Sequence, residues 1–143
     1  MRVFLNNSRT FKSYFDHPHH HDFMLANQCM ACAMDDQEKI HDPETGDLVA
    51  IYTDGIGVVA FGYASDDIAY VNDDRVDGCE TMVRRLDQFT MIACPIKHTE
   101  FDTGVRGTLH EVLTGTNEFV ACLTHRALPK PDDTLFETAK AVG

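Results

Sequence analysis

The segment 46–65, GDLVAIYTDGIGVVAFGYAS, constrains the fold of this chain more than any other. It holds two apolar runs rich in Val, Ile, Tyr and Phe, at 48–52 and 56–63, which are joined by the turn sequence TDG at 53–55. Asp-Gly supplies the positive φ angles that a tight hairpin needs, so the sequence predicts two antiparallel strands. Both runs are apolar on both faces, which predicts a central place in a curved sheet or small barrel.

Weaker patterns predict further short elements along the chain. Strand patterns cover 3–6, 28–34, 88–96, 108–113 and 118–124, the last two as a second hairpin around Gly115. Helical spacing predicts short helices at 8–15, 22–25 and 132–142, and a helical turn at 81–86. The polar segments 35–43 and 65–77 are expected to be a surface loop or short helix and an exposed connection. The predicted fold class is therefore α+β, a small barrel of five to six mostly antiparallel strands with two to four short helices.

Composition bounds the class of protein. With 143 residues the chain has the size of one ordinary domain, which we expect to span 1–143. No run approaches the ~20 apolar residues that a membrane span requires, and the apolar start is too short for a secretory signal, so a cytoplasmic location is expected. The five cysteines are odd in number and show no repeated spacing, which indicates reduced thiols rather than a disulfide framework.

The net charge of −11 bears on any nucleic-acid hypothesis, because phosphate binding depends on Lys and Arg. The charge is uneven: residues 1–74 carry a net −9 and residues 75–143 a net −2. A phosphate-facing surface is thus expected from the second half, with the candidates Arg84, Arg85, Lys97, Arg106 and Arg126. An acidic surface can equally keep a protein soluble at high salt.

Two sets of residues invite a catalytic or metal-binding hypothesis. Imidazole and thiolate are the usual zinc ligands, and the weak metal candidates are His17, His19, His21, Cys29 and Cys32. Only one CxxC is present, so no metal site and no cofactor are predicted. A small hydrolase or phosphoesterase could use His98, His110 or His125, but none of them lies in a recognisable catalytic motif.

The central hairpin resembles that of a known superfamily. A GD-apolar-Tyr strand, with Gly46-Asp47 at its start and Tyr52 at its end, is followed by the return strand GIGVVAFG at 55–62. This pairing resembles the core of PUA-like domains of the EVE and YTH branch, including the EVE-like modules of modification-dependent restriction systems. Residues 3–8 and 27–33 resemble the first strand and the pocket-lining segment of these domains. The resemblance spans about residues 3–128 and implies a PUA-like, EVE-type domain.

The resemblance implies a non-catalytic module that accommodates a flipped, modified base in a pocket at the barrel mouth. Such a pocket needs a stacking aromatic, amides or hydroxyls for the base edge, and nearby cations. The candidates for the base pocket are Asn6, Asn7, Ser8, Asn27, Gln28, Met30, Tyr52, Phe61 and Tyr63. The expected partners are DNA or RNA with a modified base and an effector or nuclease protein of a restriction or defence system.

The acidity of the first half supports an alternative from another class. An acidic protein-interaction protein, or a nucleic-acid mimic, would occupy the basic groove of a partner with carboxylates spaced like phosphates. Pairs of Asp at 35–36, 66–67 and 73–74 are the candidates. Salt dependence separates the two hypotheses, because a nucleic-acid binder loses affinity as salt rises and a mimic binds no nucleic acid.

Overall fold

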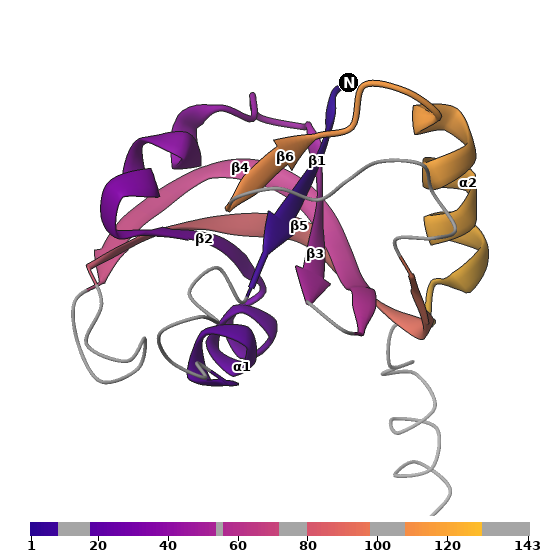
Figure 1. Cartoon of the computed structure of the whole chain (residues 1–143), viewed down its shortest axis with the longest axis horizontal. Helices are drawn as coiled ribbons and strands as arrows, with labels where there is room; N and C mark the ends of the chain where they lie inside the picture. Colours follow the sequence, from indigo (N-terminus) through magenta and orange to yellow (C-terminus); the bar gives the residue numbers. More distant parts are fainter. Residues whose placement is uncertain (9–17, 54–55, 72–79, 98–107, 130–143) are drawn as a thin grey trace, which may run out of the picture.

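The computed structural model describes residues 1–8, 18–53, 56–71, 80–97 and 108–129. In these ranges six strands form one curled, half-barrel sheet, and three helices pack against it (Figure 1). The strands are β1 (Val3–Asn7), β2 (Cys29–Ala33), β3 (Leu48–Thr53), β4 (Gly57–Val71), β5 (Thr81–Ile96) and β6 (Leu109–Glu111). The helices are α1 (Pro18–Asn27), the 3-10 helix η1 (Met34–His41) and α2 (Thr116–Arg126). The predicted α+β class, with five to six mostly antiparallel strands and two to four helices, is confirmed.

The strand order is β2-β5-β4-β3-β1-β6, and only β1 and β3 are parallel among these neighbours. The hairpin predicted from the TDG sequence is the β3–β4 pair, in which Thr53 lies opposite Gly57. Gly57 has a φ of +117°, and a Cβ there would lie 2.5 Å from the carbonyl oxygen of Ile96 on β5. Only glycine allows this close approach of β4 to β5.

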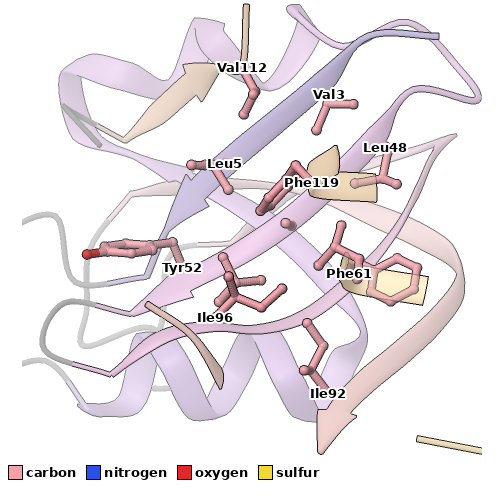
Figure 2. Close-up of a cluster of buried hydrophobic side chains, with 12 residues drawn as sticks. Val3, Leu5, Leu48, Tyr52, Phe61, Ile92, Ile96, Val112 and Phe119 are labelled. Carbon is pink, nitrogen blue, oxygen red and sulfur yellow. The ribbon is translucent and has the colours of Figure 1, made fainter. Parts of the chain in front are cut away.

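Each face of the sheet carries its own apolar cluster, because side chains alternate along the strands. On one face Leu5 and Leu48 pack with Phe119 and Leu123 of α2 (Figure 2). On the other face the cluster includes Met24 of α1 and Ile40 of η1, together with side chains of β1–β5. The strand β3 is therefore buried on both faces, as its continuous apolar sequence predicts, and residues 3–6 of β1 are buried as well.

One polar side chain closes the half-barrel between β1 and β2, which are not neighbours in the sheet. The Asn6 amide nitrogen donates to the carbonyl oxygens of Ala31 and Thr108, each at 3.0 Å, and the Ala31 N–H donates to Asn6 Oδ1 at 2.9 Å. Asn6 is completely buried. Its amide thus takes the place of a strand partner for the Ala31 peptide group.

Several local predictions were wrong. The predicted strand 118–124 lies in α2, because Phe119 and Leu123 bury one helical face, an interaction that outweighs strand propensity. Gly115, expected in a hairpin turn, is instead the left-handed N-cap of α2, with a φ of +67°. Residues 81–86 belong to β5, and 65–71 continue β4. Helix α1 starts at Pro18, whose missing N–H costs nothing in the first turn, and it contains the helix predicted at 22–25.

The helices predicted at 8–15 and 132–142 fall almost entirely outside the described residues. Among the helices that the structure describes, none is long and apolar enough to cross a bilayer.

Candidate nucleic-acid interface

Five strand termini meet at one edge of the sheet. The parallel pair β1 and β3 ends there, since Asn7 is the partner of Tyr52 and Ser8 follows it. Because β4 and β6 run antiparallel to these strands, both begin at this edge, and β5 ends beside the start of β4. We call this site the Ser8 edge; its residues are Asn7, Ser8, Thr53, Lys97 and Thr108, and His21 of α1 is bonded to Ser8 and Thr53. Figure 1 shows α1 beside the tip of β1.

Three side chains at this edge form a closed triangle of hydrogen-bond contacts. The Ser8 hydroxyl lies 3.0 Å from the Thr53 hydroxyl, and the two hydroxyl oxygens lie 3.2 and 2.9 Å from His21 Nδ1. Ser8 directly follows β1, and Thr53 is the last residue of β3. Because the two strands are parallel and in register, both side chains project from the same face toward α1. Hydroxyls both donate and accept, and imidazole can do either, so the triangle can be satisfied in more than one arrangement.

Thr108, which precedes β6, connects this edge to η1. Its carbonyl oxygen accepts hydrogen bonds from the Asn7 N–H and the Asn6 amide, and its hydroxyl donates to Asp36. The Thr108 hydroxyl is the main reason why the pKa of Asp36 is lowered, and the nearby Lys39 ammonium adds to this effect. The main chain at the start of β6 is thereby fixed beside Asn7.

Some of the predicted base-pocket residues belong to the interior. Asn6 and Met30 are fully buried, and the Asn6 amide is bonded to main-chain groups in the barrel closure. Phe61 and Tyr52 are each 6 % exposed and lie in the cluster beneath α2. Figure 2 shows the Tyr52 ring at one side of this cluster, with its hydroxyl directed away from the other labelled side chains. Asn6, Met30 and Phe61 are therefore structural residues of the interior. Tyr52 is the neighbour of Asn7 in the pairing of β3 with β1.

The other predicted pocket residues do not belong to the hydroxyl triangle. Tyr63 pairs with Leu48, the first residue of β3, and so lies toward the opposite end of that strand. Asn27 and Gln28 are exposed at the end of α1, where the Asn27 amide donates to the Phe23 carbonyl oxygen. The structure therefore places Asn7, Ser8 and Tyr52 at one end of β1 and β3, with Ser8 on the α1 face and Tyr52 on the α2 face, and Tyr63 toward the other end.

The predicted phosphate-binding residues divide between the two ends of β5. Lys97 is exposed directly after β5, at the Ser8 edge. The Arg126 guanidinium reaches the same end of β5 and donates to the Pro95 carbonyl oxygen at 3.3 Å. Arg84 and Arg85 lie near the start of β5, and Arg106 lies outside the described residues. Two of the five candidates thus share the end of β5 that borders the Ser8 edge.

Arg84 has a structural role that contradicts its assignment to a phosphate-facing surface. It is 5 % exposed, and its guanidinium donates to the carbonyl oxygens of Ser65, Ile40 and Pro43. A buried guanidinium used by three main-chain acceptors is not available to a nucleic acid. Its neighbour Arg85 is exposed and forms long ion pairs with two aspartates of the sheet.

A buried carboxylate lies close to Arg84, at the end of the sheet opposite the Ser8 edge. Asp47 accepts hydrogen bonds from the main-chain N–H groups of Arg2 and Glu44, and its side chain is also paired with the Arg2 guanidinium. We call this site the Asp47 end; its residues are Arg2, Pro43, Asp47, Ser65 and Arg84. The Asp of the GD sequence, which contributed to the family resemblance, thus fixes the turn before β3.

The metal candidates do not converge in the part of the chain that the structure describes. Cys29 and Cys32 are three residues apart on β2, so their side chains point to opposite faces of the strand. Burial raises the pKa of each thiol to about 12, which keeps both protonated. No three His, Cys, Asp or Glu side chains come together among the described residues. His17 lies outside these residues, and the side chain of His19 is not described.

The histidines of the hydrolase hypothesis are dispersed. His110 lies on β6 and His125 is exposed in the last turn of α2, whereas His98 lies outside the described residues. The histidine that contacts a hydroxyl at the Ser8 edge is His21, which the sequence suggested only as a metal candidate. Thr53 was treated only as part of a turn. No sequence pattern marks either residue, because Ser8 and Thr53 become neighbours only through the parallel pairing of β1 and β3, and His21 reaches them from α1.

Comparison with known proteins does not assign the chain. No family model matches its sequence, and no curated protein is significantly similar to it.

Proposed function

We propose that this chain is a non-catalytic nucleic-acid-binding module of the PUA-like, EVE type, and that it accommodates a flipped, modified base at the Ser8 edge. The observation that carries the proposal is the convergence of five strand termini on the Ser8–Thr53–His21 triangle. Ligand sites in curled sheets and barrels commonly lie at the mouth, where strand ends meet. A restriction or defence system would supply the effector or nuclease partner.

The chemistry of the Ser8 edge suits the edge of a base. Base edges present both donors and acceptors, and hydroxyl, amide and imidazole groups can match either. Asn7 and Tyr52 lie at the same end of β1 and β3, with their side chains on the face of the sheet opposite to the hydroxyl triangle. A ligand can replace hydrogen bonds that these side chains make to one another, whereas it cannot easily replace main-chain bonds inside a sheet.

The distribution of charge supports this orientation despite the net charge of −11. Five exposed acids lie toward the Asp47 end, namely Asp42, Glu44, Asp66, Asp67 and Asp87, whereas Asp22 of α1 is exposed next to His21. Lys97 and Arg126 lie at the opposite end of β5. Phosphates would be repelled from the first region and attracted to the second.

Binding of the purified protein to a panel of short duplexes and single strands tests the proposal. Each strand carries one modified or unmodified base, and fluorescence anisotropy is measured at low and moderate salt. We expect modification-dependent binding that weakens as salt rises and is reduced at least about tenfold in Ser8→Ala and Asn7→Ala. Lys97→Gln should reduce affinity for all strands and lower the salt slope by about one. Arg85→Gln is the matched control.

The acidic mimic is the second candidate, and the exposed pair Asp66 and Asp67 favours it. Asp73 and Asp74 lie outside the described residues, and Arg85 already pairs with Asp67. The same panel separates the two functions. If no strand binds at any salt concentration, the base-binding proposal is wrong and a basic protein partner should be sought.

A further inference from the structure

An apolar side chain lies exposed beside the Ser8 edge. Ile56 directly precedes β4 at the tip of the β3–β4 hairpin, and it is 42 % exposed. Its N–H donates to the Thr53 carbonyl oxygen at 3.0 Å, which fixes its main chain relative to the end of β3. Single exposed apolar side chains are common on protein surfaces, so it is the position of Ile56 that is informative.

The main chain next to Ile56 is held tightly against β5. The following residue, Gly57, has a φ of +117°, and a Cβ there would lie 2.5 Å from the Ile96 carbonyl oxygen and 3.2 Å from the Lys97 Cα. No side chain fits between these main chains, so the start of β4 packs directly on the end of β5. Ile56 is therefore carried by a turn that two neighbouring strands support. Figure 1 shows this turn at the end of the sheet where α1 lies.

The groups around Ile56 match what a base flipped out of a duplex requires. Thr53, to which Ile56 is bonded, contributes its hydroxyl to the triangle at the proposed base site. Lys97, beside Gly57, is an exposed cation. A base leaves a duplex only if its stacking is lost, and proteins that unstack bases commonly insert Leu, Ile or Met into the gap. Polar base site, apolar side chain and cation thus occur together at the end of one hairpin.

We propose that Ile56 is a wedge, a side chain that enters the base stack where the modified base is flipped out, and that the ligand is therefore a duplex. This inference rests on the proposed function and names its substrate class. In a duplex, a wedge compensates part of the stacking that flipping removes. A single strand gains little from it, because its bases unstack without losing a paired partner.

Binding to matched single and double strands tests the role of Ile56. The probe is the modified strand of the panel that binds most tightly, alone and annealed to its complement, and fluorescence anisotropy is measured at one salt concentration. We expect Ile56→Ala to reduce affinity for the duplex about tenfold and affinity for the single strand less than about twofold. Ile56→Leu should retain the affinity for the duplex, because an aliphatic side chain of the same size still fills the gap.

A fluorescent base beside the modified base reports the insertion itself. In the duplex, 2-aminopurine replaces the neighbouring base, and its emission rises when it is unstacked. Wild type and Ile56→Leu should raise the emission on binding, whereas Ile56→Ala at saturating concentration should raise it less, because the neighbouring bases can stack again. Unchanged affinity for the single strand shows that the variants are folded.

Leu113→Ala is the matched control. Leu113 is 77 % exposed and lies at the opposite end of β1, where the Val112 N–H donates to the Val3 carbonyl oxygen. Its removal should leave both affinities unchanged. Modification-dependent binding confined to single strands, or an equal change for both ligands in Ile56→Ala, overturns the inference and leaves the proposed function standing. Absence of binding to every strand and duplex overturns both.

Discussion

At the Asp47 end of the sheet, a buried carboxylate and a buried guanidinium are bonded to main-chain groups, whereas at the Ser8 edge two hydroxyls and an imidazole are bonded to one another. Both sites lie at the ends of the same strands, and both contain buried polar side chains. Polar groups committed to the main chain hold the fold, since removing them leaves buried peptide groups unsatisfied. Hydroxyl and imidazole groups that are bonded to one another can exchange partners, which is what a binding site requires.

The largest expected difference in the free energy of unfolding is between variants of the two adjacent arginines of β5. Arg84→Met should lower the free energy of unfolding by about 4 kcal/mol, because three buried carbonyl oxygens lose their donor. Arg85→Met should cost less than about 1 kcal/mol, since its ion pairs are exposed and long. Urea denaturation monitored by circular dichroism measures both. Equal losses of unfolding free energy in the two variants would mean that the main-chain contacts of Arg84 do not stabilise the fold.

The next largest difference in the free energy of unfolding is expected between variants of the two neighbouring asparagines of β1. Asn6→Ala should destabilise the protein by about 3 kcal/mol, because the Ala31 peptide and the Thr108 carbonyl lose their partner in the barrel closure. Asn7→Ala, on the half-buried opposite face of β1, should cost about 1 kcal/mol or less. The same urea titration compares the two. A small loss for Asn6→Ala would show that the closure is held by other contacts.

The effect of alkaline pH on stability tests the packing of β2, because the buried thiols of Cys29 and Cys32 flank Ala31 on this strand. Their pKa values are raised from 9.0 to about 12 in the folded protein, so the stability that they contribute is complete below pH 9 and is lost as pH rises toward 12. At pH 10 the loss should be about 1 kcal/mol per thiol relative to a Cys29→Ala, Cys32→Ala variant. Urea midpoints of both proteins at pH 8 and pH 10 measure it. Identical pH dependence would contradict the burial of these thiols.

The hydroxyls of the Ser8 edge should matter least for stability. Thr53→Val removes one hydroxyl from the triangle and should cost about 1 kcal/mol, and Thr53→Ser less. Thermal unfolding by differential scanning calorimetry is the measurement. A loss as large as that for Arg84→Met would place Thr53 in the framework and remove the contrast between the two ends.

The sequence predicted the parts of the structure that depend on local patterns. The β3–β4 hairpin follows from the TDG turn and its apolar flanks, and the α+β class follows from the number of short elements. The helix α2 was missed because Val120 and Thr124 have strand propensity, while the burial of Phe119 and Leu123 that decides the outcome is a tertiary interaction. The triangle could not be predicted because Ser8, His21 and Thr53 meet only through the parallel pairing of β1 with β3.

Mapping of the bound surface by amide chemical shifts tests most directly the claim that the Ser8 edge is the binding site. A 15N-labelled sample is titrated with the tightest-binding modified strand, and ¹H–¹⁵N spectra are recorded after assignment. If the Ser8 edge binds the strand, we expect shifts for Asn7, Ser8, His21, Thr53 and Lys97, and none at Asp47, Ser65 or Arg84. Shifts centred on the Asp47 end, or a spectrum that no strand changes, would contradict it.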